Sequence, residues 1–379
     1  MDTLRELPPA PYENVPAEYL MRQKITIMGY PEVANLDDLK ALSLDDENVE
    51  PFGLVNSYLP LTLYTVAIAS GAMLFGYDIG TVGAIVDMSA FVEKFGDNVT
   101  TNPKSFHDLT KGVLIGISSL GGCIGGLGTT QLIPALGPRC TIFIAAVCVC
   151  LGNMTILLSE VWFQALGGRL IYGLGNGMVC VACPMFISEL APTRTRGLFI
   201  SILQLQITIG IITGAITMYV SNSVFGDNRN NFFQYGYPLL QGMALSLVAC
   251  AVIFMVPESP TWLVSQEQDT DNFEKAKSSV ARSRKLPFDH PLVEAYVENL
   301  ASMTKVITAE EEGKDASVRL QSLRRGQPKY LLRVLTGIAL SCFQQGTGIN
   351  YFFFFGTSIF RTVGSDYQSL LALKGPNYL

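Results

Sequence analysis

Seven long runs of apolar residues constrain this chain more than any other feature of its sequence. A helix needs about 20 mostly apolar residues to cross the hydrocarbon core of a bilayer, and each run reaches that length. Only Asp78 and Arg169 place a charge deep inside a run. We therefore expect an all-α integral membrane protein, with spans at residues 60–86, 112–133, 140–159, 161–187, 198–220, 236–256 and 334–360.

The composition agrees with a membrane protein and excludes other classes. Hydrophobic residues make up 49% of the chain and charged residues 15%, whereas soluble domains carry about 25% charged residues. A net charge of −6 argues against nucleic acid as a partner, because nucleic-acid binding requires a basic surface. The chain has only two histidines and no pattern of a catalytic triad, metal site or phosphate loop. Neither an enzyme nor a bound cofactor or metal is expected.

Polar segments divide the chain into parts. The first 60 residues hold eleven acidic and four basic residues and no apolar run long enough for a signal peptide. A second polar stretch, with amphipathic helical patterning, separates the sixth and seventh spans. The expected parts are a flexible cytosolic N-terminal tail (1–59), a six-helix half (60–256), a cytosolic helical linker (257–333), a seventh transmembrane helix (334–360) and a short tail (361–379).

The arginines near the ends of the spans indicate the orientation. With a cytosolic N-terminus, the cytosolic connections hold Arg139, Arg194 and Arg196, as the positive-inside rule requires. The sequon at Asn98 then lies outside, so Asn98 is expected to carry a glycan. The expected location is the plasma membrane, in a multi-pass arrangement.

Six short strings, in this order along the chain, carry a family resemblance. They are FGYDIG (75–80), GRLIYGLGNGM (168–178), PMFISELAP (184–192), Arg196-Gly197, PESPTWL (257–263) and QQGTGIN (344–350). Together they resemble the sugar porter family of the major facilitator superfamily, most closely its fungal hexose transporters. The resemblance implies a carrier of hexoses or similar polyols that works by alternating access, in some members with protons as a second partner.

The two charges inside the spans, Asp78 and Arg169, are expected to pair. An unpaired charge in a membrane is costly, and the resemblance implies that these positions approach each other across the first and fourth helices. In proton-coupled members the matching aspartate is the protonatable switch. Two interpretations remain open: a proton-coupling pair or a static salt bridge.

Amide side chains inside apolar spans are the candidates for sugar binding. An amide offers both donors and an acceptor, which suits a neutral polyol, and the resemblance implies that the matching amides bind sugar hydroxyls. Gly346 and Gly348 are expected to break the helix there, as in other carriers. Hydrogen bonding between helices is the alternative role. The candidate residues are Gln204, Gln344, Gln345 and Asn350.

Two further sets of residues match gating positions of the family. Phe354 and Phe355 match an outer gate, with a lipid-facing aromatic band as the alternative. Charges at the cytosolic ends of the spans are expected to form ion pairs that lock the inner side, with solvated charges as the alternative. These charges are Arg139, Glu189, Arg194, Arg196 and Glu258.

The segment PALGPR (134–139) departs from the family pattern. Pro134 stands where the family usually has an aspartate, and Pro138 where it has an arginine. This departure predicts a weaker inner lock.

Glycines recur at helical spacing in three of the spans. Small residues in a row allow two helices to approach closely in lipid. We expect helix contacts at Gly121, Gly122, Gly125, Gly126, Gly173, Gly175, Gly177, Gly210 and Gly214.

Only one span follows the linker, whereas the family places a second half there. The chain alone is therefore not expected to transport, and association with other carrier chains becomes an expected property. Two rival functions stay open: a sugar sensor and a truncated product that does not transport.

Overall fold

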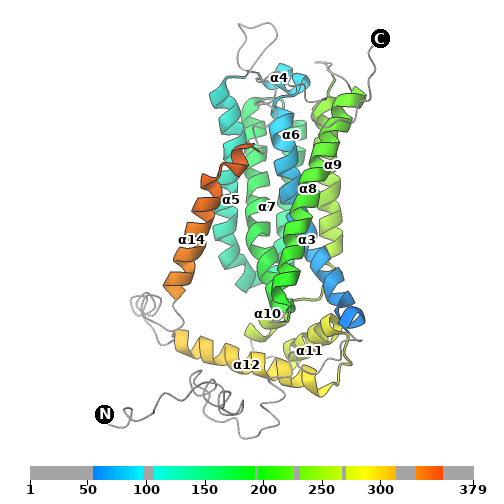
Figure 1. The fold of residues 1–379 in the computed structure, drawn as a ribbon, viewed down its shortest axis with the longest axis vertical. Helices are drawn as coiled ribbons and strands as arrows, with labels where there is room; N and C mark the ends of the chain where they lie inside the picture. The colour runs from blue at the N-terminus through cyan, green and yellow to red at the C-terminus, as the bar shows by residue number, and fades with distance from the viewer. Residues whose placement is uncertain are drawn as a thin grey trace, which may run out of the picture. The chain divides into compact units, whose positions relative to one another are not determined.

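Six long helices form the membrane-spanning part of the chain (Figure 1). The computed structural model describes residues 54–96, 106–192, 195–225, 231–266, 270–312 and 330–352, and every regular element in these ranges is a helix. Six of these helices are long and apolar enough to cross a bilayer. They confirm the first six predicted spans: α3 (Leu54–Val86), α5 (Asp108–Leu136), α6 (Pro138–Leu158), α7 (Trp162–Leu190), α8 (Arg196–Phe225) and α9 (Phe233–Ile253).

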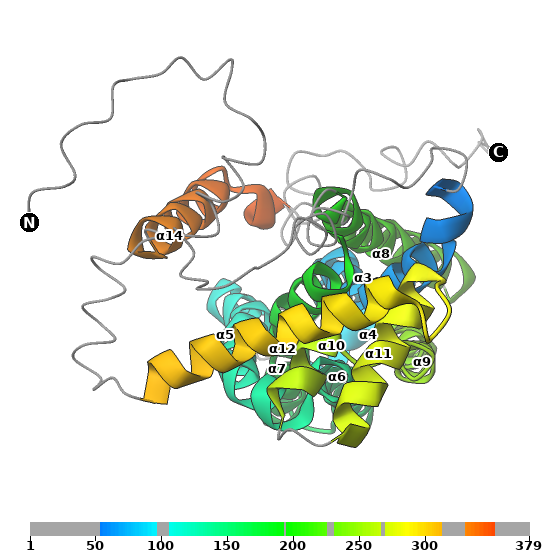
Figure 2. The same cartoon turned by 90° about the horizontal axis from the view of Figure 1, so that it is seen from below.

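Shorter helices cover the two ends of this bundle. At one end lies α4 (Ser89–Phe95), whose first backbone N–H groups face the buried Gln234: the Gln234 Oε1 atom accepts from the Ala90 N–H at 3.0 Å. At the other end the polar linker forms α10 (Pro260–Ser265), α11 (Thr270–Arg284) and α12 (Pro291–Glu312). Figure 2 shows these three helices lying across the ends of the spans. Their apolar sides form a small core of their own: Leu263, Ala276, Val280, Val293 and Val297.

Glycines bring two pairs of spanning helices into backbone contact. A Cβ atom added to Gly76 of α3 would lie 2.0 Å from the carbonyl oxygen of Ile207 in α8. On the contact between α5 and α7, a Cβ atom added to Gly173 would lie 2.1 Å from the carbonyl oxygen of Ser118. No side chain fits at either position. The structure therefore confirms the predicted role of the glycine rows in close packing.

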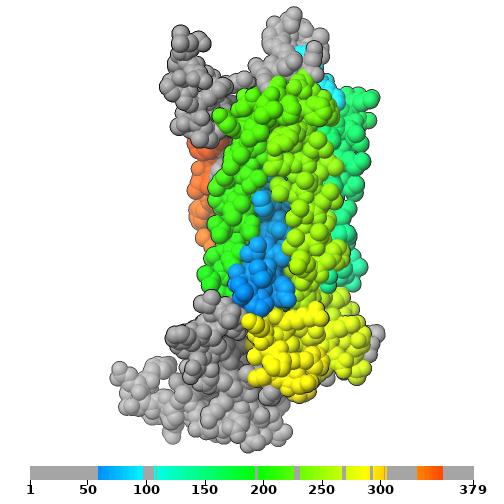
Figure 3. Space-filling model, turned by 90° about the vertical axis from the view of Figure 1, so that its right-hand side faces the viewer, coloured from blue at the N-terminus to red at the C-terminus, as the bar shows by residue number. Residues whose placement is uncertain are grey.

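The outward faces of the spans are apolar. Figure 3 shows the lower part of α3, in blue, in the gap between α8 and α9. There Leu59 and Leu63 are 52% and 60% exposed. Leucines at such exposure would be unfavourable in water, but they suit a surface that faces lipid tails.

The helix that carries the amide motif is shorter than predicted. Helix α14 runs from Tyr330 to Gly346, 17 residues, or about 25 Å at 1.5 Å per residue. Gly348 then adopts a positive φ of 72°, and a further turn of helix follows to residue 352. The predicted break at Gly346 and Gly348 is confirmed. Residues 353–360, which complete the predicted seventh span, lie outside the described residues, as do residues 1–53 and the C-terminal tail.

The close contact between α3 and α8 gives a direct test. Replacing Gly76 with Ala places a methyl group against the Ile207 carbonyl, so the helices must separate. We expect the free energy of unfolding in detergent to fall by about 1–3 kcal/mol. The matched control is Gly116→Ala in α5, where an added Cβ atom meets nothing within 4 Å. Equal stability of the two variants would contradict the packing described.

Candidate functional site

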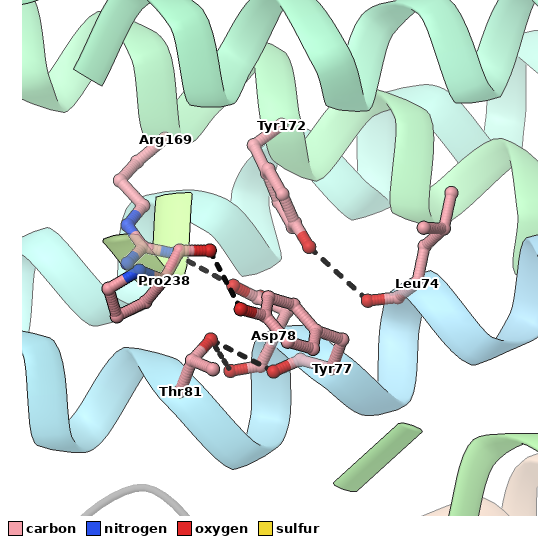
Figure 4. Close-up of polar contacts among 7 residues, drawn as sticks. All are labelled: Leu74, Tyr77, Asp78, Thr81, Arg169, Tyr172 and Pro238. Carbon is pink, nitrogen blue, oxygen red and sulfur yellow. Dashed lines mark hydrogen bonds and ion pairs between the residues drawn. The ribbon is translucent and has the colours of Figure 1, made fainter. Parts of the chain in front are cut away.

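A buried ion pair joins α3 to α7 (Figure 4). The Arg169 Nη1 atom lies 2.7 Å from the Asp78 Oδ1 atom, and the two side chains are only 4% and 8% exposed. Each charge therefore supplies the counter-ion that the apolar surroundings of the other lack. The structure brings together the two charged residues that the sequence places inside spans.

Two tyrosines extend this contact to neighbouring helices. The Tyr172 hydroxyl, one turn along α7 from Arg169, donates to the Leu74 carbonyl of α3 at 3.2 Å. The Tyr77 hydroxyl donates to the Pro238 carbonyl of α9 at 2.7 Å. Figure 4 shows both bonds beside the ion pair. These two hydrogen bonds join α3 to α7 and to α9. Tyr77 directly precedes Asp78 in the sequence, and Tyr172 lies near Asp78 in space.

Pro238 also creates a link between α8 and α9. Proline has no N–H, so the Gln234 carbonyl, four residues earlier in α9, lacks its usual helical partner. The Ser221 hydroxyl of α8 donates to that carbonyl instead. Nearby, the Thr217 hydroxyl of α8 donates to the Gln241 Oε1 atom at 2.9 Å. These bonds between helices are buried or partly buried.

The structure brings two of the four candidate amides together. The Asn350 Nδ2 atom donates to the Gln345 Oε1 atom at 2.9 Å, across the helix break at Gly346 to Gly348. Gln344 and Gln345 are exposed, and Gln204 is exposed on α8. Among the described residues, no hydrogen bond joins Gln204 to the amides of α14. The gate residues Phe354 and Phe355 lie outside the described residues.

At the linker end of the bundle, Glu258 and Glu189 accept hydrogen bonds. The Glu258 Oε1 atom accepts from the Arg139 backbone N–H at 3.2 Å and from the Ser259 N–H at 3.4 Å. The Ser259 hydroxyl donates to a Glu189 carboxylate oxygen. Burial raises the pKa of the Glu258 carboxyl above its usual value, and the two backbone N–H groups oppose that shift.

Among the described residues no ion pair joins these charges, although the positive charge of Arg139 opposes the rise in the pKa of Glu258, so the inner lock stays a prediction. The Arg139 guanidinium donates to the Phe254 carbonyl at 2.6 Å and lies 5.2 Å from the Phe254 ring centre. The reason is local: the last carbonyls of a helix lack N–H partners, and Phe254 directly follows α9. Arg196 is exposed, and Arg194 lies outside the described residues, as does the sequon residue Asn98.

Sequence reasoning missed the residues that complete these contacts. Ser259 had a readable signal, because a serine followed by proline is a common start of a helix. The Ser259 side chain indeed accepts from the Trp262 N–H at the start of α10. Nothing in the sequence indicated the hydrogen bonds of Tyr77 and Tyr172, because a tyrosine in an apolar span is expected simply to pack in the core.

Comparison with known proteins supplies the family. A sequence model described as "Sugar (and other) transporter" matches residues 63–373. Hexose transporter 2 of Kluyveromyces lactis is 32% identical over 341 residues, which cover 88% of this chain and 57% of that protein. Hexose transporter HXT14 of Saccharomyces cerevisiae is 31% identical over 361 residues, covering 90% of this chain and 66% of that protein. The chain thus spans less than two thirds of the length of these relatives.

Solved structures show the same fold. The xylose transporter XylE from E. coli, in a partially occluded inward-open conformation, matches with a TM-score of 0.58 at 23% identity, over 79% of this chain and 66% of that one. The proton:xylose symporter XylE of the major facilitator superfamily, bound to 6-bromo-6-deoxy-D-glucose, matches with a TM-score of 0.68 at 22% identity, over 84% and 65%. At this identity the likeness establishes the fold.

The buried ion pair predicts that removing Arg169 alone destabilises the protein more than removing both charges. Arg169→Met removes the cation and leaves the Asp78 carboxylate buried alone, so the free energy of unfolding in detergent should fall by about 3–5 kcal/mol. Adding Asp78→Asn should recover part of that loss. The control is Lys111→Met, which breaks a more exposed pair with Asp87 (side chains 25% and 14% exposed) and should cost about 1 kcal/mol or less. A double variant no more stable than Arg169→Met would contradict the pairing.

Proposed function

Because this chain belongs to the sugar (and other) transporter family, we propose that it takes part in moving a hexose or similar polyol across a membrane by alternating access. The observation that carries the proposal is the extent of the family match. It begins in α3 at residue 63, runs through all six spanning helices and includes the amide motif after α14. The relatives named as hexose transporters support the same substrate class.

The sugar site in this proposal is made by Gln204, Gln344, Gln345 and Asn350. The hydrogen bond between Asn350 and Gln345 supports it, because that bond orients two amides while other donors and acceptors of both stay available. The exposure of the amides also leaves them accessible to a ligand. Phe354 and Phe355 are the proposed outer gate over this site.

The proposed energy source is a proton that binds Asp78. A proton on Asp78 would cancel its charge and free Arg169, which biases the contact between α3 and α7 and hence the access state. The buried position of the pair supports this role, as does its place in the same six-helix bundle as Gln204. In cells that take up sugar, proton coupling would alkalinise the medium, and Asp78→Asn would abolish that change. If Asp78 and Arg169 form a static salt bridge, sugar uptake would leave the external pH unaltered both in cells with the unmodified chain and in cells with Asp78→Asn.

The proposed location is the plasma membrane, with the N-terminus and the α10–α12 end in the cytosol. The arginines at that end support this orientation. It predicts that Asn98 carries a glycan in a eukaryotic membrane. A glycosidase should then shift the band of the unmodified chain on a gel, and Asn98→Gln should remove the shift. A chain that resists the glycosidase from the start would reverse the proposed orientation.

Sugar binding tests the substrate class directly. The chain in lipid nanodiscs should bind labelled hexose in a saturable way. Gln345→Ala removes both a hydroxyl partner and the acceptor for Asn350, so the affinity should fall by about 1–3 kcal/mol. The control is Gln206→Ala on α8, an amide outside the proposed site. Equal affinities for the two variants, or no saturable binding by the unmodified chain, would contradict the proposal.

A second candidate function is a chain that binds sugar without carrying it. The observation that favours it is the exposure of both Gln204 on α8 and the amides of α14, which do not enclose a site among the described residues. Uptake of labelled hexose in cells without their own carriers separates the two. Saturable uptake by this chain alone supports the carrier, and binding without uptake supports the second candidate or a need for another carrier chain.

A further inference from the structure

The turn between α5 and α6 contains a backbone carbonyl that its own helix cannot satisfy. The last four carbonyls of a helix have no partner within it. Near the end of α5, the Gly137 N–H donates to the Ile133 carbonyl at 2.9 Å. The next carbonyl, that of Pro134, would need an N–H at position 138, and Pro138 has none. Pro138 therefore leaves the Pro134 carbonyl without a hydrogen-bond partner from its own helix.

Two side chains, one on the first linker helix and one directly after it, donate to this carbonyl. The Trp262 Nε1 atom donates to the Pro134 carbonyl at 3.1 Å, and the Gln266 Nε2 atom donates to the same oxygen at 3.0 Å. Trp262 lies on α10 and Gln266 directly follows the last residue of that helix, so the two donors reach one oxygen from neighbouring positions of the chain.

Gly137 lets the indole ring reach the turn. A Cβ atom added to Gly137 would lie 3.2 Å from two carbons of the Trp262 ring and 3.2 Å from a Glu258 carboxylate oxygen. The residue also has a positive φ of 84°, which side chains disfavour. A glycine here thus serves both the turn and the contact with Trp262.

Other bonds fix α10 to the same end of the bundle. The Ser259 hydroxyl donates to Glu189 of α7, and Glu258 accepts from the Arg139 backbone at the start of α6. The Ser279 hydroxyl of α11 donates to the Glu258 carbonyl at 2.6 Å. Helix α10 is therefore tied to α5, α6 and α7 within a few residues of chain.

We propose that Trp262, Gln266 and the Pro134 carbonyl form a clasp that replaces a charged lock and makes α10 a fixed part of the six-helix half. An ion-pair lock is weakened by salt, whereas the clasp consists of neutral hydrogen bonds and a ring contact. This device goes beyond the proposed transport function and does not depend on it.

Amide hydrogen exchange measures the clasp on the full chain in nanodiscs. Trp262→Phe keeps an aromatic ring but removes the N–H together with part of the indole, and Gln266→Met keeps the length of the side chain while removing its donor. With both changes, the amides of 260–266 and of the turn at 134–141 should exchange about tenfold faster or more, and together. The matched control is Ser265→Ala, because the Ser265 hydroxyl donates only to the Trp262 carbonyl within α10. Faster exchange in α10 alone, or in neither segment, would overturn the clasp.

The effect of salt concentration provides a second test of the proposal, and this test needs no substitution in the clasp. The chain has two tryptophans, so Trp162→Phe leaves Trp262 as the one indole fluorophore. Quenching of its fluorescence by acrylamide, a neutral quencher, should stay constant as salt rises from about 0.1 M to about 1 M. Quenching that increases with salt would show that charges hold α10, and would overturn the proposal.

Discussion

The buried contact between Asp78 and Arg169 is the interaction on which the six-helix half depends. Two opposite charges lie 2.7 Å apart inside the helix bundle, with side chains only 4% and 8% exposed, and burying either charge without the other is unfavourable. The pair therefore fixes the rotation and height of α3 relative to α7. The glycine rows act on the same helices, since α3 can approach α8, and α7 can approach α5, only where side chains are absent.

Two prolines account for further hydrogen bonds between separate elements of the fold. Each proline removes an N–H and leaves a carbonyl four residues earlier without a helical partner. In α9 the carbonyl freed by Pro238 is met by Ser221 of α8. At the α5–α6 turn the carbonyl left without a partner by Pro138 accepts from Trp262 of α10 and from Gln266, which follows α10. In both places a backbone carbonyl without a helical partner accepts a hydrogen bond from a side chain of another element.

Sequence patterns predicted the parts of this fold that follow from local chemistry. Run length predicted the six spans, the spacing of glycines predicted the close helix contacts, and Gly346 with Gly348 predicted the break after α14. The contacts at the linker end were not predictable in the same way. The charges of Arg139 and Glu258 suggested an ion pair, but the start of α6 and the end of α9 supply backbone partners that depend on where those helices begin and end. The bond between Gln345 and Asn350 likewise depends on the geometry of the break.

Solid-state NMR in lipid bilayers tests the central ion pair most directly. Carbon-13 at the aspartate carboxyls and nitrogen-15 at the arginine guanidinium groups report short contacts between the two residue types. Among the described residues, the contact of Asp78 with Arg169 is the one ion pair between an aspartate and an arginine. The account predicts a strong carbon–nitrogen dipolar coupling that disappears in Asp78→Asn. A coupling that is absent from the unmodified chain, or that persists in the variant, would contradict it.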